Sequence, residues 1–325
     1  MGITAGRGSL VHRVHEIPQT PMTDRRPTAF SDVTDERLRT LFDEESYVAD
    51  DHVVTTVLLA LRLGKPLLVE GEPGAGKTEL AKVLAAGFDA ELVRLQCYEG
   101  LTAENALYEW NYTKQLLAVQ ASDDDASVFS EEFLLERPLL RALRGGSPPP
   151  VLLIDEVDRA DEEFEALLLE VLSDFQVSVP ELGTIRAETP PIVVITSNRT
   201  RALSDALKRR CLFLHVSPPS FEKERAILER KVPALDGAVA TELCAMAKRL
   251  REEPLRKPPG AAETIDWARA VAALRAENDD PLTPEEIHET LGCLLKEVED
   301  VERVDESLLE TLVEAAADAR AEVTP

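Results

Sequence analysis

Cysteine is scarce in this 325-residue chain, which has only four. The four are widely spaced and form no Cys-x-x-Cys pair, which argues against a zinc site or a disulfide framework. We therefore expect Cys97, Cys211, Cys244 and Cys293 to be thiols of the core.

Long apolar runs are also missing. No stretch of about 18 apolar residues occurs, and the most apolar part of the N-terminal region, residues 10–17, is interrupted by His12, Arg13 and His15. Neither a membrane span nor a secretory segment is predicted. We expect a soluble, cytoplasmic protein.

Basic charge is low relative to acidic charge. Lysine and arginine total 36 against 61 aspartates and glutamates, which gives a formal net charge of -25. Such a surface repels phosphate backbones, so a nucleic-acid partner is not expected. Only 10 of the basic residues are lysines, a bias that we attribute to a GC-rich or salt-adapted source.

The residues that are present indicate three regions. Residues 1–45 read as a leader and linker, flexible to about residue 30 and helical in pattern from Ser31, with Met22 as an alternative start. Residues 46–219 alternate short apolar runs with helical patterns, which is typical of a three-layer α/β fold. Residues 220–325 read as an all-helical lid domain, for which we expect four helices.

The α/β region contains five short apolar runs that predict a buried parallel sheet. They span residues 66–69, 91–95, 151–154, 192–196 and 211–216. The connection between the second and third runs, residues 96–150, is unusually long. We therefore place an insertion at about residues 96–137 and expect helices at 113–120 and 130–143.

The insertion concentrates aromatic residues in a chain with only 5% of them. It holds Tyr98, Tyr108, Trp110 and Tyr112. Aromatic side chains can pack within the insertion or contact another protein, and the sequence leaves both interpretations open.

A glycine-rich octapeptide lies between the first predicted strand and a predicted helix. It reads Gly71-Glu72-Pro73-Gly74-Ala75-Gly76-Lys77-Thr78. The backbone N–H groups of such a loop and the positive end of the next helix surround phosphates, while the lysine and the threonine serve the outer phosphates and Mg²⁺. We predict that this loop, extended to Glu79, binds ATP or GTP with Mg²⁺.

Two carboxylates follow the third predicted strand. In a buried parallel sheet, Asp155 and Glu156 would lie at the carboxyl edge, where ligands bind. There Asp155 can hold Mg²⁺ through water, and Glu156 can orient or deprotonate an attacking water. Asn198, after the fourth strand, can contact the γ-phosphate or that water, although an asparagine there can also simply form a turn.

Three arginines are further candidates. Arg209 and Arg210, with Lys208, precede the fifth strand, where a guanidinium can reach the nucleotide of a neighbouring subunit, Arg210 being preferred. The same residues can instead complement the negative end of a helix. Arg269 in the lid can report the nucleotide state or be an ordinary surface arginine.

This order of motifs resembles that of the AAA+ ATPases over about residues 50–320. The run Asp155-Glu156-Val157-Asp158-Arg159-Ala160, the helix after it and a predicted hairpin at 175–187 are similar to the MoxR branch. Residues 95–100, 106–112 and 205–211 are similar to the CoxD-like group. One segment departs from the pattern, because Arg209-Arg210-Cys211 stands where Asp-Arg-Phe is usual, so both arginines remain candidates.

The resemblance implies an ATP-hydrolysing ring, usually a hexamer, that remodels client proteins beside a partner with a von Willebrand factor A domain. CoxD-like members are linked to maturing the active site of molybdenum hydroxylases such as carbon monoxide dehydrogenase. The resemblance also implies that Asn198 is sensor 1, that Arg210 is the trans finger and that Arg269 is sensor 2. The alternatives are a nucleotide-gated scaffold with little turnover and a DNA-associated motor, which the net charge disfavours.

Overall fold

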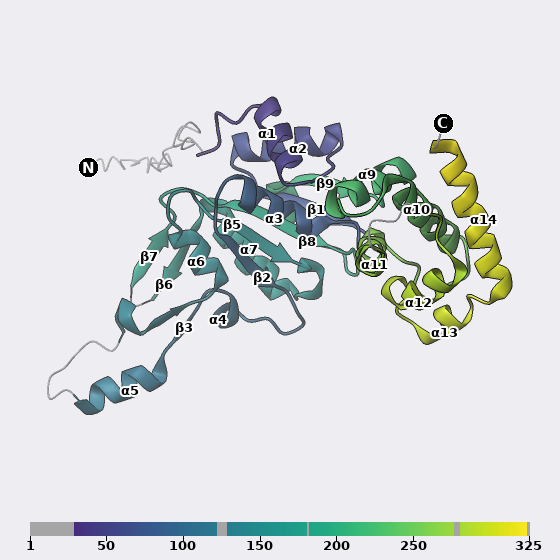
Figure 1. The fold of residues 1–325 in the computed structure, drawn as a ribbon. Coiled ribbons are helices and arrows are strands. Elements are labelled where there is room, and N and C mark those ends of the chain that lie inside the picture. Colours follow the sequence, from purple (N-terminus) through teal and green to yellow (C-terminus); the bar gives the residue numbers. More distant parts are fainter. Residues whose placement is uncertain (1–28, 122–128, 181, 276–279, 324–325) are drawn as a thin grey trace, which may run out of the picture.

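The computed structural model describes residues 29–121, 129–180, 182–275 and 280–323, so the predicted leader before residue 29 lies outside it. Its centre is a five-stranded parallel sheet in the order β2-β5-β8-β1-β9 (Figure 1). The strands are β1 (Leu67–Gly71), β2 (Leu92–Gln96), β5 (Val151–Asp155), β8 (Ile192–Ser197) and β9 (Leu212–Val216). All five predicted strands are confirmed.

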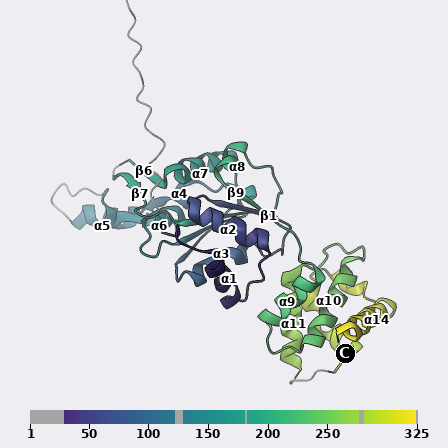
Figure 2. The ribbon, with the colours of Figure 1, turned by 90° about the horizontal axis from the view of Figure 1, so that it is seen from above.

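Alternate residues of each strand face opposite sides of the sheet and build two separate cores. On β1, Leu68 packs in one core, whereas Leu67 and Val69 pack in the other. Both faces are covered by helices, which explains why these strands read as continuous apolar runs. Figure 2 shows α1, α2 and α3 on one side of the sheet and α7 and α8 on the other. The three-layer prediction is thereby confirmed.

The helices of these layers have the following bounds. One face carries α1 (Asp35–Glu44), α2 (Asp51–Leu63) and α3 (Lys77–Gly87). The other carries α6 (Pro138–Arg144), α7 (Glu162–Asp174) and α8 (Asp205–Arg210).

The first of these helices corrects the prediction that residues 1–45 are a leader and linker. Leu38, Leu41 and Phe42 of α1 are almost fully buried in the core beneath α3, and Phe30 joins the same cluster. Gly87 explains the close fit, because a Cβ there would lie 2.1 Å from the Leu41 side chain. Residues 30–45 therefore belong to the α/β domain and not to a linker.

The insertion contains a predicted helix and an unpredicted sheet. Helix α5 (Tyr112–Ala121) confirms the prediction for 113–120. The helix predicted over 130–143 is wrong in its first half, where a 3-10 turn (Glu131–Phe133) leads into β4 (Leu134–Glu136), antiparallel to β3 (Tyr108–Trp110). Proline explains the boundary, since Pro138 begins α6 and holds the residue before it in an extended conformation.

Packing within the insertion is confirmed for some of its aromatic residues, whereas contact with another protein stays a prediction for the exposed ones. Trp110 is buried and meets Tyr108 and Phe129 edge-on, at centroid distances of 6.1 and 5.4 Å. Tyr98 and Tyr112 are instead exposed. In Figure 1, α5 projects away from the sheet beyond β3, after the short helix α4 (Ala103–Ala106).

A second small sheet completes the α/β region. It is the hairpin of β6 (Gln176–Val179) and β7 (Gly183–Arg186), as predicted for 175–187. It follows α7 directly, and Val177 and Val179 pack in the same core as that helix.

The lid domain has six helices in its described part, two more than predicted. They are α9 (Phe221–Lys231), α10 (Gly237–Arg251), α11 (Ala261–Leu274), α12 (Pro284–Leu294), α13 (Val298–Glu302) and α14 (Glu306–Val323). Thr283 caps α12 through a reciprocal bond with Glu286, as the sequence predicts. Trp267 lies at the centre of the lid core, and its indole N–H donates to Thr290.

Several smaller expectations concern the interior. Cys97, Cys211 and Cys244 are buried free thiols, and Cys293 is half-buried. Among the described helices, none combines the length and apolar character that a bilayer crossing requires.

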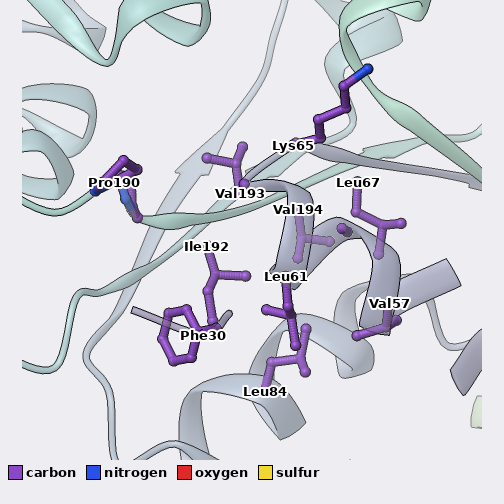
Figure 3. A pocket seen from close by; sticks show the side chains of 13 residues that line it. Phe30, Val57, Leu61, Lys65, Leu67, Leu84, Pro190, Ile192, Val193 and Val194 are labelled. Carbon is purple, nitrogen blue, oxygen red and sulfur yellow. The ribbon is translucent and has the colours of Figure 1, made fainter. Parts of the chain in front are cut away.

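A cavity of about 20 Å³ lies under the amino ends of β1 and β8, where Figure 3 shows Phe30 beside Ile192, Leu61 and Leu84. It has room for about one water molecule.

The role of α1 leads to a stability prediction. Leu41→Ala should lower the free energy of unfolding by about 2–5 kcal/mol, because it removes a fully buried side chain from a packed core. Thr40→Ala, on the exposed face of the same helix, should change it by less than about 0.5 kcal/mol. Urea titration of both variants measures the difference, and equal stabilities would contradict the inclusion of residues 30–45 in the core.

Candidate functional site

The carboxyl edge of the sheet opens into a cavity of about 560 Å³ between the α/β domain and the lid. β1 ends there at Gly71, β5 at Asp155 and β8 at Ser197. This is the edge at which open parallel sheets bind their ligands, and the volume is in the range of small-molecule sites. The predicted phosphate loop, carboxylates, asparagine and lid arginine all reach this cavity, since Lys77, Asp155, Glu156, Asn198 and Arg269 line it.

The phosphate loop has the backbone that its glycines permit. Gly74 and Gly76 have φ values of 79° and 87°, in the left-handed region that favours glycine. Gly71 is needed for a different reason, because a Cβ there would lie 2.2 Å from the carbonyl oxygen of Val216 on β9. Residues 73–79 line the cavity, whereas Gly71 and Glu72 lie outside its lining.

Lys77 begins α3 and is buried, with 7% of its surface exposed. Its ammonium donates to the carbonyl oxygens of Gly71 and Glu72, at 2.9 and 2.7 Å. Burial lowers the pKa of Lys77, and nearby carboxylates, Asp158 first among them, only partly offset that effect. A desolvated ammonium at the start of a helix is prepared to receive a negatively charged ligand.

Asp155 is the most connected side chain of the site, and it is buried. Its Oδ1 accepts from the hydroxyls of Thr196 at 2.5 Å and Thr78 at 3.1 Å. Its Oδ2 accepts from Nη2 and Nε of Arg94, at 2.6 and 3.1 Å. Through these contacts, the end of β5 is tied to the start of α3, to β8 and to β2.

Glu156 stands next to it in a strained conformation. Its φ of 55° and ψ of 49° place a non-glycine residue in the left-handed region, a feature that concentrates at functional sites. Its carboxylate accepts from Gln96 at 3.0 Å, Arg159 at 2.9 Å and the Asn198 amide at 3.3 Å. The structure thus brings Glu156 and Asn198 together, as the sequence predicts.

The loop after β8 is held by a second carboxylate, Asp158. It accepts from the backbone N–H of Asn198 and from both the backbone and the hydroxyl of Thr200. Burial alone would raise the pKa of Asp158, but these hydrogen bonds outweigh it and keep the pKa below its ordinary value. Arg199, which lies between Asn198 and Thr200 in the sequence, has a φ of 62° and is a second strained residue at this edge.

The lid forms the opposite wall of the cavity. Arg269 on α11 lies there, pairing at 3.3 Å with Asp266, and Ile227 and Ile265 add apolar surface. Glu79 accepts from Lys231 of α9 at 2.9 Å, a bond that crosses between the domains. The tip of the phosphate loop also meets the start of α11, because a Cβ on Gly74 would lie 3.6 Å from Gly260.

Arg209 and Arg210 are not brought to this cavity. Both are exposed on α8, and Arg210 donates to Ser173 of α7 at 2.9 Å. Neither residue lines the cavity.

Sequence reasoning missed four residues that complete the site: Arg94, Gln96, Thr196 and Thr200. One signal could have found the first two. Arg94 and Gln96 are polar residues two apart in an apolar strand, which places both on one face, and β2 lies directly beside β5.

The donors present suit Mg²⁺ together with a nucleotide. Mg²⁺ is usually held by one or two protein oxygens plus substrate phosphates. Thr78 and Asp155 supply such oxygens 3.1 Å apart, at the mouth of a loop with Lys77 at its centre. These residues would hold the ion.

Thr196 provides a test of this arrangement. Its buried hydroxyl donates to Asp155 and accepts from the backbone N–H of Glu156, so Thr196→Val leaves two buried polar groups without this partner. The free energy of unfolding should fall by about 1–3 kcal/mol. Thr184→Val, on the exposed β7, should change it by less than about 0.5 kcal/mol, and Thr196→Ser should restore most of the loss. Urea titration compares them, and a neutral Thr196→Val would contradict the arrangement.

Curated relatives match part of the chain. The chain is 24% identical over 210 residues to Uncharacterized protein SH1500 of Staphylococcus haemolyticus, covering 62% of this chain and 74% of the relative. It is 29% identical over 180 residues to Uncharacterized protein YehL of Escherichia coli, covering 53% of this chain and only 46% of YehL.

Among solved structures, the Thermotoga maritima RuvB Holliday junction branch migration motor is similar. Its TM-score is 0.46 at 20% identity, covering 88% of this chain and 85% of that one. A likeness at this level carries no inference about what the present chain acts on.

A family model gives the assignment. Residues 66–211, from β1 to the residue before β9, match the AAA domain of the dynein-related subfamily. This span includes the phosphate loop, both carboxylates and Asn198. Residues 66–211 are therefore similar to the AAA domain of the dynein-related subfamily.

Proposed function

We propose that the protein is an ATP-hydrolysing AAA+ chaperone of the MoxR type that works as a ring. One observation carries the proposal: Glu156, in a strained conformation, lies beside Asp155 at the mouth of a phosphate loop, inside a cavity of about 560 Å³. A carboxylate in that place is suited to act on a water that attacks a γ-phosphate.

Each residue then has a role in ATP hydrolysis. The N–H groups of residues 74–78 and the ammonium of Lys77 bind the phosphates. Thr78 and Asp155 would hold Mg²⁺, which would supply positive charge to stabilise the phosphates. Glu156 orients and deprotonates water, and Asn198 positions Glu156, because its amide donates to that carboxylate.

The base of the nucleotide has a separate place. Tyr47 and Val48 line the cavity before α2, and Ile227 and Ile265 of the lid line it as well. These apolar side chains suit a purine ring. Because they come from both the α/β domain and the lid, a bound base would contact both domains and couple the lid to nucleotide binding. Arg269, on the same helix as Ile265, acts as the lid's sensor of the phosphates.

The position of Arg210 supports the proposal that the protein assembles. An arginine that is exposed and lies outside the lining of its own cavity can serve a neighbouring subunit's nucleotide. We therefore propose a homo-oligomeric ring, a hexamer by its resemblance to the AAA+ ATPases, with Arg210 as the trans finger and Arg209 as the alternative.

The client surface that we propose is α5. Tyr112, Leu116, Leu117 and Val119 are all exposed on this projecting helix. Exposed apolar groups gathered in this way suit contact with another protein. By resemblance to CoxD-like proteins, the client would be a molybdenum hydroxylase such as carbon monoxide dehydrogenase, with a von Willebrand factor A domain protein as partner.

A nucleotide-gated scaffold with little turnover is the second candidate. It is favoured by the hydrogen bonds that Arg94, Gln96 and Arg159 make to the two carboxylates, which leave neither of them free in a single chain.

Hydrolysis distinguishes the two candidates. Glu156→Gln should leave the Kd for ATP within about twofold and lower the turnover rate at least about 100-fold, because the amide cannot accept the proton. Glu162→Gln, on the exposed start of α7, is the matched control and should hydrolyse ATP normally. Fluorescent ATP titration and phosphate release measure both. Equal turnover in the two variants would remove Glu156 from its role, and an inactive wild type would favour the scaffold.

The finger is tested by mixing variants. Arg210→Ala should bind ATP normally and hydrolyse it about 1000-fold more slowly, as expected for a lost arginine finger. Lys77→Ala subunits, which cannot bind ATP, still carry Arg210. Mixed rings of the two variants should therefore recover part of the activity in a phosphate-release assay. Mixtures without any recovery would contradict action in trans, and loss of activity in Arg209→Ala alone would transfer the role to Arg209.

A further inference from the structure

Within the part of the chain that the structure describes, Arg94 is the one cation that bonds directly to the buried carboxylate of Asp155. Two of its nitrogens, Nε and Nη2, donate to the same oxygen, Oδ2. The Asp155 side chain is 5% exposed, whereas that of Arg94 is 53% exposed and lines the cavity. A buried carboxylate without a compensating charge is costly, so this contact supplies the charge that Asp155 needs in the absence of a ligand.

The same carboxylate is the one that would meet Mg²⁺. Its other oxygen, Oδ1, already faces Thr78, the second expected metal ligand. A guanidinium and a divalent cation at one carboxylate repel each other strongly in a partly buried site. Both cannot be favoured there at once.

We propose that Arg94 is the resident counter-ion of Asp155 and is displaced when Mg²⁺ and nucleotide bind, so that it weakens metal binding to the empty site. This inference rests on the proposed nucleotide site. Arg94 can move without unpacking the core, because half of its side chain is exposed and β2 is an edge strand. Removing its charge should therefore make the Mg²⁺-dependent part of nucleotide binding stronger.

The displacement would also reach Glu156. Nη2 of Arg94 donates to Oε1 of Gln96 at 2.6 Å, and the Gln96 amide donates to Glu156. When Arg94 leaves, Gln96 loses the partner that fixes its side-chain orientation. Arg94 is therefore a positioning residue that links the metal site to the proposed base.

The test compares the affinity for mant-ADP with Mg²⁺ and with EDTA. The quantity of interest is the Kd in EDTA divided by the Kd with Mg²⁺. For Arg94→Ala, this ratio should rise about tenfold over that of the wild type, which corresponds to about 1.4 kcal/mol. The Kd in EDTA should hardly change. Arg141→Ala is the matched control, since this arginine pairs with Glu91 just before β2 and lies outside the cavity lining; its ratio should equal that of the wild type.

Arg94→Lys guards against misfolding, because it retains the charge but not the two-nitrogen contact. Its ratio should lie between those of the wild type and Arg94→Ala. Thermal unfolding adds a second readout: Arg94→Ala should be less stable than the wild type in EDTA and recover most of that loss with Mg²⁺ and ADP. A merely structural ion pair would lower stability equally in both conditions.

An unchanged or lower ratio in both Arg94 variants overturns the inference while leaving the proposed function intact, provided the wild type binds mant-ADP. A wild type that does not bind mant-ADP with Mg²⁺ overturns the proposed function and, with it, the inference.

Discussion

The compensation of one buried negative charge, that of Asp155, organises the functional edge of this protein. Its carboxylate is held by Thr78 at the start of α3, Thr196 on β8 and Arg94 on β2. These contacts join the end of β5 to three elements that are distant from it in sequence, and they leave Glu156, the next residue, at the mouth of the cavity. The position of the proposed base therefore depends on how the charge of Asp155 is satisfied.

The lid depends on the same edge through contacts that cross the cavity. Lys231 of α9 pairs with Glu79 on the helix after the phosphate loop, and the loop itself meets the start of α11 at Gly260. The Lys231–Glu79 pair is half-buried and still reached by solvent, so these contacts can rearrange at modest cost. A ligand that fills the cavity would contact both domains and fix their relative position, which is how nucleotide binding would reach the rest of an assembly.

The sequence predicted the sheet well because its strands are buried on both faces and therefore read as apolar runs. The cap of α12 at Thr283 was also predicted, because its signal lies in neighbouring residues. Errors arose where tertiary packing decided the outcome, as in α1, whose buried face was hidden in a polar segment, and in β4, which exists only because it pairs with β3. Arg94 was missed because its role comes from the pairing of β2 with β5, a contact between residues 61 positions apart.

We propose that one chain contains half of an ATP-hydrolysing site and that a neighbouring subunit completes it. The most direct measurement is the ATP turnover per subunit over a wide range of protein concentration, with the oligomeric state followed in parallel by mass photometry. The account predicts that turnover per subunit rises with concentration and follows the fraction of assembled rings. Turnover per subunit that stays constant while the protein passes from monomer to ring would contradict it.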